Sequence, residues 1–155
     1  MCDNVVRHER SHPARGVRVD LAEPTIVFLT VCTKDRMPWL AQDDVHAALR
    51  NLWQNEEGWL VGRYVLMPDH VHLFCAPHDL RYDLRHWVSW WKRKMSCLHL
   101  SSAGLWQRDF WDRRLRRSES YGEKWMYVRE NPVRKGLVVR SDDWPYQGIV
   151  HELRW

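Results

Sequence analysis

Apolar residues recur along the chain in two rhythms, one typical of strands and one typical of helices. Short β-branched and apolar runs, such as residues 25–33, predict strands that lie inside a sheet. Leu84, Trp87 and Trp91 recur at helical spacing and predict an amphipathic helix. The predicted elements, in chain order, are a strand over residues 25–33, a helix over 43–57, strands over 59–67 and 70–76, a helix over 80–99, a strand over 110–117 and a helix from Ser118 or Ser120 to about 131.

The order of these elements predicts the fold class. A β-α-β-β-α-β series followed by a helix is the ferredoxin-like pattern, an α+β fold with an antiparallel sheet and helices packed on one face. The length of 155 residues suits one domain. Residues 1–22 are polar and rich in arginine and histidine, so we expect a flexible basic arm there and a single folded domain over residues 23–155.

Targeting signals and cysteines indicate where the protein works. The first residues contain no long apolar run, so no signal peptide is expected. No stretch approaches the roughly 18 apolar residues that a membrane span requires. The four cysteines are scattered without a Cys-x-x-Cys pair, which argues against a zinc ribbon and favours reduced thiols. We therefore expect a cytoplasmic protein, monomeric or homodimeric, without a membrane partner.

Basic residues lie next to aromatic residues in two parts of the chain. The formal charge is +4 and the chain has 11 tryptophans, so both kinds of side chain are plentiful. Cations that follow a phosphate backbone and rings that stack on bases suit single-stranded nucleic acid, whereas a solvated basic helix face is the alternative. In a strand over residues 110–117, Leu115 would point to the core and leave two arginines on the other face. The candidate DNA-binding residues are Lys92, Arg93, Lys94, Arg114 and Arg116.

Two histidines in the strand predicted over residues 70–76 are candidate metal ligands. His70 and His72 are separated by one residue, and side chains at i and i+2 of a strand point to the same face. Two adjacent imidazoles can hold a divalent cation, although a His-x-His pair also occurs as ordinary polar residues on a wet sheet face. A zinc hydrolase would usually carry more histidines and an aspartate close behind, whereas Leu73 and Phe74 follow here.

A tyrosine and an asparagine near the end of the last predicted helix are the candidate nucleophile and third ligand. Tyr127 and Asn131 are four residues apart and so share a helix face. A tyrosine hydroxyl has an ordinary pKa of about 10, so it needs a cation that polarises the attacked phosphate. Glu130 is the alternative to Asn131 as a ligand. Tyr121 is the alternative nucleophile, and it lies about 240° around the helix from Tyr127.

Two ordered groups of motifs resemble a known family of transposases. The string Met-Pro-Asp-His-Val-His-Leu over residues 67–73 resembles the signature of single-tyrosine HUH transposases, in which two histidines flank one bulky hydrophobic residue. Motifs nearer the C-terminus resemble the branch called REP-associated tyrosine transposases, and the likeness covers roughly residues 25–146. These motifs are Trp106-Gln107, Phe110-Trp111-Asp112, Tyr127-Val128, Asn131-Pro132-Val133-Arg134 with Gly136, and Asp143-Trp144-Pro145.

The resemblance implies that residues 23–155 form an HUH transposase-like catalytic domain that cleaves and rejoins single-stranded DNA. It implies that Tyr127 forms a 5′-phosphotyrosine intermediate, and that His70, His72 and Asn131 bind Mg²⁺ or Mn²⁺. It also implies recognition of REP-like hairpins with a short flanking tetranucleotide, as part of DNA transposition. A replication initiator or relaxase with the same chemistry, and a non-catalytic ferredoxin-like nucleic-acid-binding module, are the alternatives.

Overall fold

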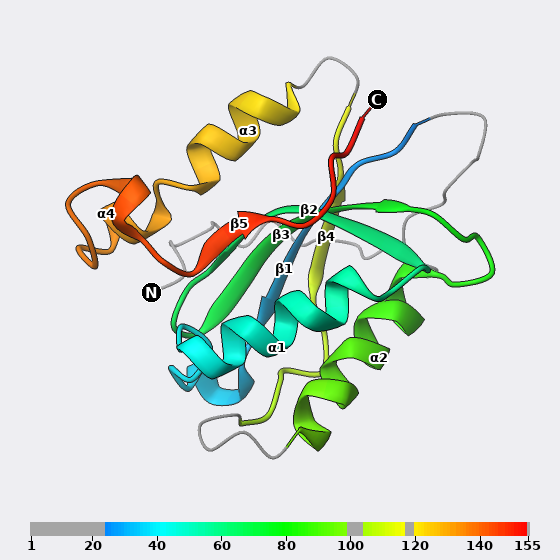
Figure 1. The fold of residues 1–155 in the computed structure, drawn as a ribbon, viewed down its shortest axis with the longest axis horizontal. Coiled ribbons are helices and arrows are strands. Elements are labelled where there is room, and N and C mark those ends of the chain that lie inside the picture. Colours follow the sequence, from blue (N-terminus) through cyan, green and yellow to red (C-terminus); the bar gives the residue numbers. More distant parts are fainter. Residues whose placement is uncertain (1–23, 99–103, 117–119, 155) are drawn as a thin grey trace.

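The computed structural model describes residues 24–98, 104–116 and 120–154, and the expected basic arm over residues 1–22 lies outside them. Within the described residues, helices lie on both sides of a sheet (Figure 1). No helix among them is long and apolar enough to cross a membrane. The elements in chain order are β1 Val27–Cys32, the 3₁₀ helix η1 Lys34–Arg36, α1 Asp43–Gln54, β2 Trp59–Leu66, β3 His70–Pro77, α2 Leu84–Cys97, β4 Trp111–Arg114, α3 Tyr121–Val128, α4 Asn131–Arg134, the 3₁₀ helix η2 Ser141–Asp143 and β5 Gln147–Ile149.

The sheet has five strands in the order β4-β1-β3-β2-β5, and each neighbouring pair is antiparallel. The first four strands follow the ferredoxin-like order, with β1 and β3 at the centre. The predicted α+β fold class is therefore confirmed. β5 is not among the predicted elements, because three residues are too few for an alternating pattern to stand out from the tail around it.

Apolar side chains on both faces of the sheet build two cores. The larger core lies between the sheet and the helices α1 and α2, where Leu73 belongs to the same cluster as Trp53 and Trp91. The smaller core lies between the sheet and α3, where Phe74 belongs to the same cluster as Trp125. Neighbouring residues of β3 thus divide between the two cores, as the alternation of a strand requires. The two helices of the ferredoxin-like repeat share one face, and the additional helix α3 covers the other (Figure 1).

Most tryptophans of the described residues belong to the cores. Trp53 and Trp91 make an edge-to-face contact with ring centroids 5.8 Å apart, and both rings are fully buried. Trp87 contacts Trp91 at 6.2 Å and stacks on Trp59 at 6.1 Å. Trp111 on the edge strand β4 is 37% exposed, so it differs from these rings in having a surface that a base can reach.

An irregularity in β2 lets the start of α3 approach the sheet. The register between β2 and β3 shifts in the middle of β2. Close to the shift, the backbone N–H of Arg63 donates a hydrogen bond to the Tyr121 hydroxyl at 2.9 Å. A Cβ atom on Gly62 would lie 2.6 Å from both the Tyr121 hydroxyl and the side chain of Leu153. Gly62 therefore permits the contact that anchors α3.

Gly62→Ala is expected to destabilise the fold by about 1–3 kcal/mol, because the added methyl group overlaps two packed side chains. The free energy of unfolding, measured by urea titration, checks this. Gly122→Ala is the matched control, since a Cβ there meets only the Ser120 Oγ at 3.7 Å, and alanine favours a helix by up to about 1 kcal/mol. Equal stability of the two variants would contradict the packing argument.

Candidate active site

His70 and His72 lie side by side on the central strand β3, opposite the end of β1. Their ring centroids are 4.7 Å apart, with the ring planes at 77°. Phe74, two residues further along, contacts the ring of Tyr121 at the start of α3, with centroids 4.9 Å apart. Because alternate residues of a strand share a face, both histidines point to the side of the sheet that α3 covers.

Each histidine ring is held by a hydrogen bond at Nδ1. His70 Nδ1 is 2.7 Å from Asp69 Oδ1, and His72 Nδ1 is 2.8 Å from Thr30 Oγ1. Partners of this kind set the orientation and tautomer of metal-binding histidines in proteins. They leave the Nε2 atom of each ring as the nitrogen that can bind a metal ion. The pair is therefore oriented before any ligand arrives.

Asp69 is itself held by a strained turn that follows β1. Arg36 Nε donates a hydrogen bond to Asp69 Oδ2 at 2.9 Å, and Asp35 and Arg36 have positive φ angles of 53° and 57°. This region is costly for residues other than glycine, and such strain collects at functional sites. Burial raises the pKa of Asp69, but the hydrogen bonds and positive charges of His70 and Arg36 outweigh burial and hold that pKa well below its usual range. The carboxylate thus stays ionised near neutral pH and can orient His70.

The surroundings of His72 favour its neutral form. Burial, and then the positive charges of His70, Arg134 and Lys124, lower the pKa of His72 well below its ordinary value. A metal ion binds the neutral imidazole, because the bonding lone pair must carry no proton. A metal ion at His72 would therefore meet an imidazole whose neutral form is already favoured.

Tyr127 lies on the same side of the sheet, near the end of α3, and is 61% exposed. Lys124 connects it to the histidines, since its Nζ is 5.8 Å from the centroid of the Tyr127 ring and 5.5 Å from that of Phe28. Phe28 in turn stacks on His72, with centroids 5.3 Å apart and planes at 22°. The candidate nucleophile and the candidate metal ligands therefore lie on one face of the sheet.

Asn131 begins the short helix α4, just after α3 ends. Its Oδ1 accepts a hydrogen bond from the guanidinium of Arg134, which also donates to the backbone carbonyl of Tyr127 at 2.9 Å. The four-residue spacing thus brings Tyr127 and Asn131 to one guanidinium. Glu130, the alternative ligand, is the residue before α4 and makes no side-chain capping bond to it. The roles of Asn131 and Glu130 as ligands stay predictions.

Tyr121, the alternative nucleophile, is committed to the fold. Its hydroxyl is bound to the backbone of β2, and its ring packs on Phe74. Burial raises the pKa of the Tyr121 phenol, which disfavours the phenolate that would attack phosphorus. These contacts favour Tyr127, which is exposed, as the residue that meets a substrate.

Three side chains of this region are the candidate ligands of a divalent metal ion. The Nε2 atoms of His70 and His72 and the amide oxygen of Asn131 are the candidate donors, a set that fits Mn²⁺ better than Mg²⁺ by ligand type. In the part of the chain that the structure describes, no group of three His, Cys, Asp or Glu side chains is arranged to hold a metal ion. A third protein ligand for a metal ion at the histidine pair would therefore have to be of another type, such as the amide oxygen of Asn131, and this role stays a prediction.

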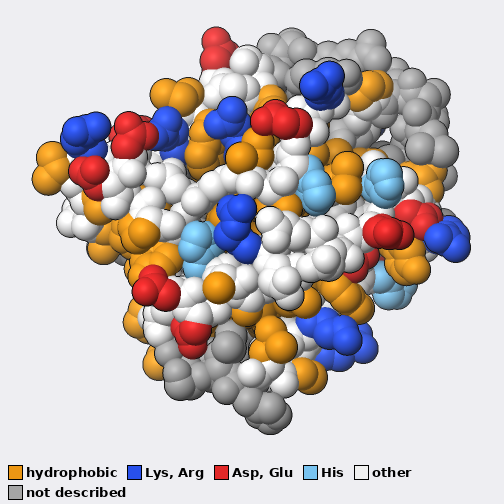
Figure 2. All heavy atoms as spheres, in the orientation of Figure 1, with side chains coloured by type: hydrophobic (Ala, Val, Ile, Leu, Met, Phe, Trp, Pro, Cys, Tyr) orange, Lys and Arg blue, Asp and Glu red, His pale blue; other side chains and the backbone are white. Residues whose placement is uncertain are grey.

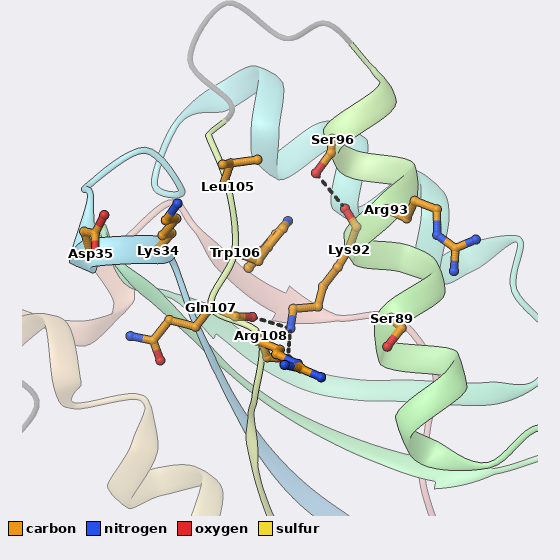
Figure 3. A pocket seen from close by; sticks show the side chains of 10 residues that line it. All are labelled: Lys34, Asp35, Ser89, Lys92, Arg93, Ser96, Leu105, Trp106, Gln107 and Arg108. Carbon is orange, nitrogen blue, oxygen red and sulfur yellow. Dashed lines mark hydrogen bonds between the residues drawn. The ribbon is translucent and has the colours of Figure 1, made fainter.

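The candidate DNA-binding residues on α2 lie on the other side of the sheet. Lys92 and Arg93 line a cavity of about 680 Å³ between α2 and the segment before β4 (Figure 3). Lys92 is buried, and its Nζ donates to the backbone carbonyls of Gln107 at 2.6 Å and Arg108 at 3.3 Å. Its charge therefore holds this segment against α2 rather than facing solvent. Lys94 is exposed on α2 and does not line the cavity.

The arginines chosen on β4 point away from the histidines. Leu115 is buried as predicted, but it belongs to the smaller core on the α3 side. Arg114 pairs with Val27, whose side chain belongs to the larger core, so Arg114 points to the opposite side. Arg116 follows Arg114 by two residues and shares its side by alternation. Leu115 and the two arginines thus lie on opposite faces as predicted, but both faces of the sheet carry a core, so this separation does not place the arginines beside the histidines. The DNA-binding roles of Arg114 and Arg116 stay predictions.

Two residues of β4 that are not among the candidate DNA-binding residues lie on the histidine face. Arg113 pairs with Phe28, and Trp111 pairs with Thr30, the partner of His72. Both are exposed. The alternation of the strand separates them from Arg114, but only the pairing with β1 shows which set faces the site. A cation and an exposed ring therefore border the histidine pair.

Charges on the face drawn in Figure 2 are mixed. In the view of Figure 2, lysine and arginine side chains are interspersed with aspartate and glutamate rather than gathered in one patch. The formal net charge is only +4, so long-range attraction to a polyanion is modest. Any binding of a phosphate chain would therefore depend on local groups of cations, such as Lys124 and Arg134 beside Tyr127.

Comparisons with known proteins agree with these motifs. No protein-family model matches the chain. A Haemophilus influenzae protein whose name assigns it to the REP-associated tyrosine transposases is 23% identical over 154 residues, which cover 88% of this chain and 86% of that protein. The REP-associated tyrosine transposase of Escherichia coli is 28% identical over 89 residues, 56% of this chain and 52% of that protein.

The fold agrees with a solved structure as well. A REP-associated tyrosine transposase bound to a REP hairpin matches with a TM-score of 0.65 and 22% identity, over 84% of this chain and 80% of that one. The chain therefore shares its fold with this solved structure, and its sequence is similar to two curated proteins that carry the same name. This likeness to the REP-associated tyrosine transposases confirms the resemblance predicted from the motifs.

Proposed function

We propose that this chain cleaves and rejoins single-stranded hairpin DNA through a 5′-phosphotyrosine at Tyr127, with a divalent metal ion bound at His70 and His72. The observation that carries the proposal is the pair of histidines whose Nδ1 atoms are already hydrogen-bonded, on the sheet face where Tyr127 lies. A module that only binds nucleic acid has no need of two oriented imidazoles opposite an exposed tyrosine.

The reaction is a transfer of one phosphodiester bond. The Tyr127 hydroxyl oxygen attacks phosphorus and loses its proton to solvent. The bond from phosphorus to the 3′ oxygen breaks, and that oxygen takes up a proton to become a free 3′-hydroxyl. A 3′-hydroxyl attacks the phosphotyrosine in the reverse step, so rejoining needs no ATP. The bound metal ion would stabilise the negative charge that develops on the phosphate oxygens.

The residues around the site prepare it for this reaction. Asp69 and Thr30 hold the two imidazoles, so little reorganisation is needed when the metal binds. Lys124 lies within 6 Å of the Tyr127 ring and adds positive charge where a phosphate must sit. Trp111 and Arg113 at the edge of the sheet can stack on a base and bind a phosphate of the same strand.

The choice of hairpin DNA as substrate is supported by the relatives. The solved relative with the same fold is bound to a REP hairpin, and the curated relatives carry the name of REP-associated transposases. Replication initiators and relaxases share the chemistry, so the substrate separates them. A hairpin single strand should react, whereas a duplex nicking site should not.

One experiment tests the proposal directly. The full chain is incubated with a 5′-labelled and a 3′-labelled hairpin oligonucleotide, with Mn²⁺ or with EDTA, and run on a denaturing protein gel. We expect a covalent protein adduct that carries the 3′ label, appears only with the metal and is removed by protease. Tight hairpin binding without any adduct in Mn²⁺ or Mg²⁺ would support the non-catalytic binding module instead.

Salt titration tests the two possible DNA paths. If the strand follows the histidine face, Arg113→Ala should lower the slope of log affinity against log salt by roughly 0.7, the value for one phosphate contact on a single strand. If it crosses the cavity beside α2, Arg93→Ala should do so instead. Arg81→Ala is the control, because Arg81 is fully paired with Asp79 before α2. We expect the Arg113 effect, and the Arg93 effect alone would move the path to the other face.

A further inference from the structure

One guanidinium connects the candidate nucleophile to the candidate third ligand. The Arg134 side chain donates to the Tyr127 backbone carbonyl at 2.9 Å and to Asn131 Oδ1. Its Cζ also lies 4.4 Å from the centroid of the Tyr127 ring, a close cation–π contact. Arg134 therefore fixes the ring and the amide relative to each other.

These contacts conflict with metal binding at Asn131. The amide has one oxygen, and Arg134 donates a charge-assisted hydrogen bond to it. A divalent cation bound to the same oxygen would stand beside the guanidinium, and the two positive charges would repel. The metal and Arg134 therefore compete for the Asn131 oxygen unless the guanidinium has another hydrogen-bond partner.

A phosphate group of the substrate can replace Asn131 as the hydrogen-bond partner of the Arg134 guanidinium. Arginine matches phosphate with two parallel hydrogen bonds, and it does so more strongly than it matches a neutral amide. Lys124 adds a second cation on the Tyr127 ring, at 5.8 Å from its centroid. A phosphate attacked by the Tyr127 hydroxyl must come close to both cations.

Resting on the function proposed above, we propose that Arg134 is a positioning residue with two alternative partners. Without DNA, it holds Asn131 and the Tyr127 ring together and keeps the metal from the amide oxygen. With DNA, it binds the phosphate next to the attacked bond, and Asn131 is released to the metal. DNA and metal then strengthen each other's binding, because binding couplings are reciprocal.

Metal affinity measured with and without DNA tests this. Calorimetric titration with Mn²⁺ uses the full chain with Tyr127→Phe, which keeps the ring and prevents cleavage, alone and with an excess of hairpin oligonucleotide. We expect the oligonucleotide to tighten Mn²⁺ binding by on the order of tenfold. Adding Arg134→Gln should tighten Mn²⁺ binding to the free chain several-fold and reduce the effect of the oligonucleotide to about twofold or less. Arg134→Lys should fall between the two.

The controls separate this inference from the proposed function. Arg140→Gln removes an exposed cation that pairs loosely with Asp142 at 3.9 Å, and it should change neither quantity. Unchanged or weaker Mn²⁺ binding to the free Arg134→Gln chain, with an unchanged unfolding midpoint, overturns the inference and leaves the metal site standing. Mn²⁺ binding that is absent from the parent, or that survives His70→Ala, overturns the proposed metal site and the inference together.

Discussion

Replacing Tyr127 with phenylalanine is expected to remove covalent DNA attachment and strand cleavage altogether. The change deletes the attacking oxygen, and loss of a nucleophile lowers turnover by several orders of magnitude in enzymes that form covalent intermediates. The ring that Arg134 and Lys124 contact remains, so hairpin affinity should stay within about twofold of the parent. Adduct formation on a denaturing gel and a filter-binding isotherm measure the two quantities.

Tyr121→Phe is the matched control for this variant. Its hydroxyl accepts a hydrogen bond from the backbone of Arg63, so its removal should cost about 1 kcal/mol of unfolding free energy. Adduct formation should persist at the rate of the parent, measured well below the unfolding temperature. If Tyr121→Phe is inactive and Tyr127→Phe is active, the assignment of the nucleophile is reversed.

His70→Ala is expected to abolish Mn²⁺-dependent cleavage through loss of the metal. His70 supplies one of the two imidazoles that lie side by side on β3, and no third His, Cys, Asp or Glu among the described residues completes a substitute site. Calorimetry should show no Mn²⁺ binding at concentrations that saturate the parent. Hairpin binding in EDTA should be retained, because neither protein then carries the metal and the proposed phosphate-binding side chains are unchanged.

Asp69→Asn gives a graded version of the same effect. The asparagine can still contact His70, but it lacks the charge that favours the correct tautomer, so Mn²⁺ affinity should fall by about 10–100-fold. His78→Ala is the control, since this histidine is exposed at the far end of β3 and should leave Mn²⁺ affinity unchanged. A similar loss in both variants would mean that Mn²⁺ binds to scattered surface groups rather than to the pair on β3.

Part of the candidate site could be predicted from the sequence, because its residues form two pairs and the members of each pair are close in sequence. His70 and His72 are adjacent on one strand face, and Tyr127 and Asn131 are four residues apart. Such relations follow from the period of a strand or helix and need no knowledge of the rest of the fold. The hydrogen bonds that orient the histidines could not be predicted in this way. Arg36 reaches Asp69 and Thr30 reaches His72 only because β1 pairs with β3.

The sequence by itself determined the order of strands and helices, the ferredoxin-like class, and which residues share a face within each element. These depend on local periodicity, which is written into the chain. Only the tertiary structure decided that α3 covers the histidine face and that Arg113 rather than Arg114 lies there. It also decided that the Lys92 ammonium group donates its hydrogen bonds to backbone carbonyls. The physical reason is that the central strands are apolar on both sides. The periodicity of apolar residues along the sequence cannot by itself show which of two buried faces a helix will cover.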